Sequence, residues 1–181
     1  MKLKELIEAC SKNDQKAQNL LYQNFKDILY LVSLKYCRNE ADAEDNLHDA
    51  FLIIFKNIKK YKHKGSFEGW MKRIVINKAI DKYKKKTLFT NEVKEHLLPD
   101  DTTVEIAQST TISLHQLLTY IQQLPDQYRL VFNLYQLDGF SHKEIATMLS
   151  ISESTSKSNF FRAKINLREK ILNDTKLNSD N

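Results

Sequence analysis

Glycine and proline are scarce in this chain, with only three Gly and two Pro among 181 residues. Hairpins, sandwiches and barrels need a turn about every ten residues, and Gly and Pro are the residues that most often form turns. So few turn formers favour long helices. We therefore predict an all-α fold, which the segments described below divide into two small helical domains joined by a flexible linker.

Several classes of protein are excluded by simple patterns. No apolar run has the length that a bilayer requires, so we expect no membrane insertion. The first 14 residues mix charges into a helical pattern and lack a secretory signal, which favours a cytoplasmic location. Cys10 and Cys37 form no CxxC motif, and the five histidines are scattered. We expect buried thiols, no metal site and no cofactor.

The charges are unevenly distributed along the chain. Lys and Arg total 28 against 23 Asp and Glu, a net charge of +5. Residues 56–86 hold twelve basic and only two acidic side chains, whereas the segments on either side are acidic. Clustered cations displace condensed counterions from a phosphate backbone, so this block favours a polyanionic partner. A solvated lysine surface is the alternative.

Two helices are predicted before this basic block, one from Leu20 and a second after the break at residues 38–40. The second has a continuous apolar stripe at helical spacing: Leu47, Ala50, Phe51, Ile54, Phe55 and Ile58. Its other side carries acidic residues beside an apolar one: Asp45, His48, Asp49 and Leu52. Such a side is either solvated surface or a docking surface for a basic helical partner, and composition leaves both open.

Turn signals over residues 62–66 precede a third helix from Phe67 to about Lys86. Arg73, Asn77 and Asp81 are four residues apart, which lines up a cation, an amide and a carboxylate on one face. Trp70 and the nearby aromatic residues can stack on unpaired bases, as in proteins that hold single strands. Simple core packing is the alternative for these aromatic residues.

Residues 87–112 are rich in Thr, Ser and acidic residues, contain Pro99 and have no sustained period. This length exceeds what a compact domain normally tolerates as a loop. We therefore predict domains at 1–86 and 113–173, an acidic linker over 87–112 and a tail over 174–181.

Four helices are predicted after the linker, at 113–123, 126–137, 142–149 and 153–172. Ser141 and Glu144 form a capping box, and a three-residue turn at 150–152 separates the last two helices. A short helix, a tight turn and a longer helix are typical of a helix-turn-helix, whose second helix enters the major groove. That helix places Phe160, Ala163 and Leu167 toward the core. A plain packing helix is the alternative.

Taken together, these segments resemble the extracytoplasmic-function (ECF) class of bacterial sigma factors. The resemblance is carried by residues 42–51, 66–74 and 77–81, and in the second half by 124–125, 128–129, 139–146, 151–155, 157–158 and 161–163. It implies a sigma factor that binds core RNA polymerase, directs it to promoters and helps to melt the DNA. It also implies that the chain is not an enzyme itself and that the acidic linker threads toward the RNA exit path.

The resemblance implies three sets of contact residues. The polymerase-binding set consists of Asp42, Asp45, His48, Asp49 and Leu52. The set for minus-10 promoter DNA consists of Lys62, Lys64, Ser66, Phe67, Trp70, Arg73 and Asn77. The set for minus-35 DNA consists of Ser154, Thr155, Lys157, Ser158, Phe161 and Arg162. The implied partners are the β′ clamp helices and β flap of polymerase, promoter DNA and an anti-sigma factor, in the bacterial cytoplasm at the nucleoid.

The sequence departs from the family's pattern at a few positions. His48 and Asp49 stand where Gln and Glu are usual, and Asn46 and Asn159 replace a common apolar residue and a frequent Arg. Ser156 stands where Val is usual, and burying it unpaired would weaken the packing of the recognition helix. Among the few arginines, Arg162 is the residue that we expect to read guanine.

Three other functions compete with this interpretation. A dimeric helix-turn-helix regulator would bind DNA without a polymerase contact. A nucleic-acid-processing enzyme would need clustered carboxylates, but the basic block holds only Glu68 and Asp81, thirteen residues apart. A structural adaptor would bind neither DNA nor polymerase.

Overall fold

The computed structural model describes residues 2–90 and 112–179, with side-chain surroundings for 2–86 and 112–174. These residues form helices joined by short turns, with no strand among them, so the predicted all-α class is confirmed. The chain divides into two compact units, Met1–Lys82 and Tyr83–Asn181.

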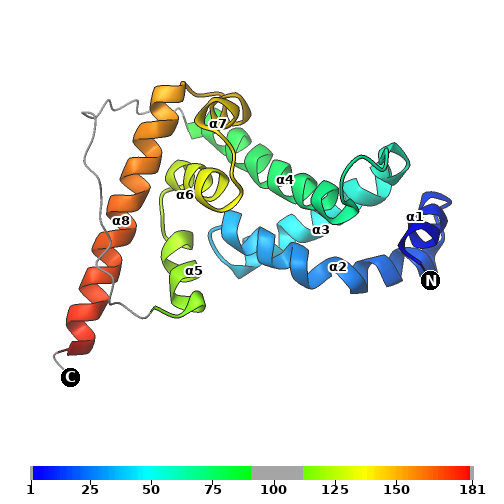
Figure 1. Ribbon diagram of the computed structural model, residues 1–181, viewed down its shortest axis with the longest axis horizontal. Helices are drawn as coiled ribbons and strands as arrows, with labels where there is room; N and C mark the ends of the chain where they lie inside the picture. Colours follow the sequence, from blue (N-terminus) through cyan, green and yellow to red (C-terminus); the bar gives the residue numbers. More distant parts are fainter. Residues whose placement is uncertain (1, 91–111, 180–181) are drawn as a thin grey trace. The chain divides into compact units, whose positions relative to one another are not determined.

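The first unit contains α1 (Leu3–Ser11), α2 (Gln15–Tyr36), α3 (Glu40–Asn57), the short 3-10 helix η1 (Ile58–Lys60) and the start of α4 (Phe67–Thr90) (Figure 1). Side-chain caps fix where two of these helices begin. Asp14 accepts a hydrogen bond from the Ala17 amide, and Asn39 accepts one from the Asp42 amide. Each cap satisfies an amide that has no partner within its helix. Helix α4 extends to Thr90, four residues into the predicted linker; residues 91–111 lie outside the described part.

The core of the first unit is built from α2, α3 and α4. Leu21, Leu29, Ile54, Met71 and Val75 are almost fully buried. The stripe predicted on α3 is confirmed except for a half-buried member, Phe55, whose ring packs 5.8 Å from that of Phe51. Both cysteines are buried as predicted, and burial raises the pKa of the Cys10 thiol to about 11.

The second unit contains α5 (Leu114–Gln122), α6 (Asp126–Phe132), a π-helical turn η2 (Asn133–Leu137), α7 (His142–Leu149) and α8 (Glu153–Ser179). All four predicted helices are present. The second of them is divided into α6 and η2, and α8 continues past residue 172 to Ser179. The predicted capping box is confirmed, because Ser141 accepts from the Glu144 amide at 3.3 Å and the Glu144 carboxylate accepts from the Ser141 amide at 2.8 Å.

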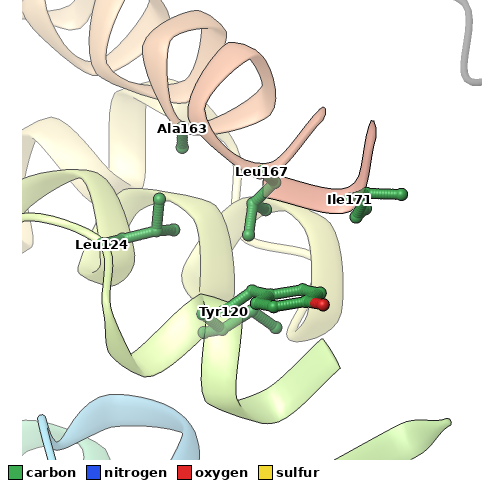
Figure 2. Packing of buried hydrophobic residues seen from close by; sticks show 6 residues of the cluster. Tyr120, Leu124, Ala163, Leu167 and Ile171 are labelled. Carbon is green, nitrogen blue, oxygen red and sulfur yellow. The ribbon is translucent and has the colours of Figure 1, made fainter. Parts of the chain in front are cut away.

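A hydrophobic cluster and a buried arginine hold this unit together. Tyr120, Ile121 and Leu124 meet Ala163, Leu167 and Ile171 of α8, and the labelled side chains converge in Figure 2. Ala163 and Leu167 therefore face the core as predicted, whereas Phe160 is half-buried. Arg129 is only 3% exposed, and its guanidinium fixes the joint between α5 and α6. It donates to the carbonyls of Gln122 (2.9 Å) and Leu124 (2.8 Å) and pairs with Asp126.

Candidate polymerase and nucleic-acid interfaces

The residues predicted to bind polymerase all lie on the polar side of α3, and we call them the docking surface: Asp42, Asp45, His48, Asp49 and Leu52. Asp45, His48 and Leu52 are exposed, and they share the outward face at i, i+3 and i+7. Leu52 is 58% exposed, so this face of α3 presents an apolar side chain to solvent. An apolar side chain among polar ones on one helical face suits a helical partner.

The other two docking residues lie on the edge of α3 that faces α4. Asp49 pairs with Lys78 at 2.8 Å, and Asp42 pairs with Lys82 at 2.7 Å. The hydrogen bond from Lys78 holds the pKa of the Asp49 carboxyl below its ordinary value, since it favours the charged form. The bond to Asp42 likewise raises the pKa of Lys82. The acidic edge of the docking surface is thus already partly neutralised within the chain.

Asn46 does not belong to the docking surface. It is 2% exposed, and its side-chain amide donates to the Ser33 hydroxyl (3.1 Å) and to the Val75 carbonyl (3.3 Å). Asn46 therefore ties α3 to α2 and α4 inside the core. Sequence reasoning recognised this residue as a departure but did not predict its contacts, because its partners come from two other helices.

The aromatic residues predicted near minus-10 DNA form one cluster at the start of α4. The Tyr61 ring lies 5.0 Å from Phe67 and 5.5 Å from Trp70, and Phe67 and Trp70 stack at 5.5 Å. Phe67 is 3% exposed, so the core-packing alternative describes it, whereas Tyr61 and Trp70 remain half-buried. Phe67 thus supports the two rings that a base could reach.

A basic turn lies beside these rings. Lys62, Lys64 and Ser66 are exposed, and Ser66 accepts a hydrogen bond from the Gly69 amide at 3.0 Å, which caps α4. Gly65 has φ +81°, a conformation that favours glycine, and its carbonyl accepts from the Tyr61 hydroxyl at 2.8 Å. The turn is therefore held against the aromatic cluster.

Arg73 and Asn77 are exposed on α4, one turn apart as predicted. Asp81, one turn further along, is exposed as well. This polar row is therefore open to solvent along α4.

The recognition helix α8 presents most of its predicted contact residues at its N-terminal end. Ser154 and Lys157 are exposed, and Lys157 pairs with Glu153 at 3.1 Å. The Ser152 hydroxyl caps the helix by accepting from the Thr155 amide at 3.0 Å. Ser158 and Phe161 are half-buried.

Arg162 is also half-buried, and its guanidinium donates to the Tyr128 hydroxyl of α6 at 3.1 Å. Sequence reasoning did not foresee this contact. It orients the guanidinium along the flank of α8, beside α6.

Ser156 is fully buried but not unpaired, so the condition that would weaken the packing of the recognition helix is not met. Its hydroxyl shares a hydrogen bond of 2.9 Å with Nδ1 of His142 on α7. The His142 ring in turn stacks on Tyr135 at 4.2 Å. A polar contact thus joins the two helices of the helix-turn-helix, and Asn159 is also buried on the core side. These pairings link separate elements, so a local pattern could not reveal them.

The stability of the second unit is expected to fall as the pH drops below about 6.5. Burial lowers the pKa of His142 from its ordinary value of 6.5; Lys157 lowers it further and Glu153 opposes this. The unfolded chain therefore takes up this proton before the folded chain does, and the stability is lost between pH 6.5 and the lower folded pKa. Above pH 6.5 the effect is absent.

This pH dependence is measured by urea unfolding of the wild type and of His142→Gln, followed by far-UV circular dichroism. The single tryptophan, Trp70, lies in the first unit, so its fluorescence provides an internal reference. His115→Gln, at an exposed position on α5, is the matched control. If the stability of His142→Gln kept the pH dependence of the wild type, the loss of stability at low pH would not come from His142.

Two structural findings concern other classes of site. Within residues 2–90 and 112–179, no three His, Cys, Asp or Glu side chains are grouped as they would be to hold a metal ion. Among the helices described, none combines the length and the apolarity needed to cross a bilayer.

Comparisons with known proteins agree with this arrangement. The family model "Sigma-70 region 2" matches residues 21–88, and "Sigma-70, region 4" matches residues 114–167. Together they cover about two thirds of the chain. The region 2 match disfavours the dimeric regulator, which would need only the helix-turn-helix.

The chain is similar to ECF RNA polymerase sigma factor SigW of Bacillus subtilis, at 29% identity over 94% of this chain and 97% of the relative. ECF sigma factor SigM of the same organism is 28% identical over 82% of this chain and 91% of the relative. The fold resembles that of the sigma factor RpoE in complex with the anti-sigma factor NepR from Bartonella quintana, with a TM-score of 0.52 and 18% identity over 86% of this chain and 96% of that one.

Two sigma-70 regions in their proper order, relatives of the same class along nearly the whole length and a shared helical fold lead to one conclusion. The chain belongs to the ECF class of the sigma-70 family, and it binds core RNA polymerase and directs the enzyme to promoters.

Proposed function

We propose that the chain divides its work between two domains, residues 1–86 and 113–173, joined by an acidic linker and followed by a tail over 174–181. The first domain binds polymerase and the unpaired minus-10 strand, and the second binds duplex minus-35 DNA. Because polymerase fixes the spacing of the two DNA elements, neither domain needs a high affinity alone.

The docking surface on α3 takes the β′ clamp helices of polymerase. Asp45, His48 and Leu52 make the central contact because all three are exposed on one face. Asp42 and Asp49 provide negative charge along the edge. Such complementarity favours rapid and specific association with a basic partner.

The minus-10 strand lies over the basic turn and the half-buried rings of the aromatic cluster. Trp70 provides a surface on which an unpaired base can stack, supported from beneath by the buried ring of Phe67. Lys62, Lys64 and Ser66 contact the phosphate backbone, and Arg73 and Asn77 contact the strand along α4.

The minus-35 element is read by α8. One observation supports this function above the others. A capped helix-turn-helix presents hydroxyl and cationic side chains outward, in a chain that also holds a polymerase-docking unit. Ser154, Thr155, Lys157 and Ser158 reach phosphates and base edges, and Phe161 contacts a thymine methyl. Arg162 reads a guanine from the flank of the helix.

Arg162→Ala is expected to cost about 1–3 kcal/mol of minus-35 binding free energy and to relax sequence specificity at one base pair. Tyr128→Phe removes the hydrogen bond to Arg162 but keeps the ring, so it tests the guanidinium's orientation separately. Binding of the holoenzyme is measured on promoters with each base at every minus-35 position. An equal loss on all sequences would make Arg162 a phosphate contact.

The remaining roles follow from this division. Core polymerase carries out RNA synthesis, and this chain is a non-catalytic factor that acts in the bacterial cytoplasm at the nucleoid. An anti-sigma factor is a further partner, supported by the complex of the related RpoE fold with NepR. The β flap of polymerase holds the second domain near the minus-35 element.

A further inference from the structure

The acidic edge of the docking surface is occupied by two lysines of α4. Lys78 Nζ lies 2.8 Å from Asp49 Oδ2, and Lys82 Nζ lies 2.7 Å from Asp42 Oδ1. The pairs lie side by side on two adjoining helices, since Lys78 and Lys82 are one helical turn apart. Asp45, on the outward face of α3, also acts electrostatically on Lys82. Two of the three carboxylates on the docking surface therefore already have cationic partners.

These ion pairs can be opened by a competitor. The side chains of Asp49 and Lys82 are 47% and 51% exposed, so water and salt screen both pairs. Exposed pairs of this kind contribute little to stability. A basic surface on a partner protein can replace the lysines, but it must first displace them.

The ion pairs are not what holds α3 against α4. Buried Asn46 donates to the Val75 carbonyl of α4, and both helices bury large apolar side chains in the core: Ile54 of α3, and Met71 and Val75 of α4. A lysine on the α4 edge can therefore be neutralised without moving the docking surface. This separation makes the role of the lysines testable by substitution.

We infer that Lys78 and Lys82 weaken and tune the binding of core RNA polymerase, because they occupy Asp49 and Asp42 until a cationic surface of polymerase replaces them. The inference rests on the proposed docking surface. It gives two lysines of the basic block a role toward polymerase, separate from any contact with DNA. Removing the positive charge of either lysine would then strengthen the binding of this protein to core RNA polymerase.

The test is equilibrium binding of the fluorescently labelled full chain to core polymerase without DNA, so that any DNA contact of the lysines plays no part. Lys78→Met and Lys82→Met are each expected to tighten binding about two- to fivefold, and the double variant about tenfold. Lys78→Arg keeps the ion pair and should bind as the wild type does. Raising the salt concentration should shrink the gain, because salt screens the pairs that are being removed.

Lys72→Met is the matched control. Lys72 pairs with Glu68 of the same helix at 2.6 Å, so its loss changes the net charge equally without freeing a carboxylate of α3. Equal tightening in Lys72→Met would reduce the effect to net charge and overturn the inference. Unchanged or weaker binding of the Lys78 and Lys82 variants would overturn it as well.

The variant Asp45→Lys distinguishes an error in the inference about the lysines from an error in the assignment of the docking surface. If Asp45→Lys prevents binding and the lysine variants show no gain, only the inference is wrong. If Asp45→Lys binds normally, the docking surface is misassigned and the inference falls with it. Circular dichroism of each variant confirms that the helices remain folded.

Discussion

Replacing Asp49 with lysine is expected to abolish association with core RNA polymerase while the helical fold stays intact. The substitution reverses the charge at the edge of the docking surface, and like charges facing each other across an interface cost several kcal/mol. The fold should tolerate the change, because the Asp49 side chain is 47% exposed and its pair with Lys78 is screened. Co-purification of the variant with core polymerase measures the effect.

Asp27→Lys provides the control for this prediction. Asp27 is exposed on α2, outside the docking surface, and the substitution makes the same change in net charge. It should co-purify as the wild type does. If the Asp49 variant also remained bound to polymerase, the docking surface would have to be placed elsewhere on the first unit.

Replacing Arg129 with methionine is expected to destabilise the second unit by about 3–5 kcal/mol, because the substitution breaks a buried charged network. The carbonyls of Gln122 and Leu124 would lose this donor, and the carboxylate of Asp126 would lose its ion pair with Arg129, although Lys86 Nζ also lies 3.4 Å from it. Small domains have little stability to spare, so minus-35 recognition should fail near physiological temperature. Arg129→Lys should recover only part of the loss, because an ammonium group lacks the planar fork.

Two optical signals show which of the two units the Arg129→Met substitution destabilises. Far-UV circular dichroism reports both units, whereas the fluorescence of Trp70 reports the first unit only. Urea unfolding of Arg129→Met should shift part of the dichroism transition to lower urea and leave the fluorescence transition in place. A shift in both signals would mean that Arg129 also supports the first unit.

Local patterns were sufficient for much of this fold. The spacing of Leu47, Ala50 and Ile54 predicted which side of α3 is buried, since neighbours on one helical face are fixed by the helical repeat. The Ser141–Glu144 capping box was likewise predictable, because both partners lie within one turn. The order of the segments was enough to place the chain in its family.

Contacts between elements were beyond the reach of such patterns. Phe67 and Trp70 are both aromatic residues in the first turn of α4, so the helical period alone does not tell them apart. The packing of α4 buries Phe67 and leaves Trp70 partly exposed. The pairing of Ser156 with His142 joins residues 14 apart across a turn. The pair of Asp42 and Lys82 spans 40 residues. Each depends on tertiary packing, which a helical period does not specify.

Run-off transcription shows directly whether this protein directs core RNA polymerase to promoters. Purified core RNA polymerase is incubated with a pool of genomic fragments, with and without this protein, and the RNA 5′ ends are mapped. We expect protein-dependent starts that share two upstream motifs at a fixed separation. The absence of such starts, with a folded and inhibitor-free protein, would mean that the chain does not direct polymerase to promoters.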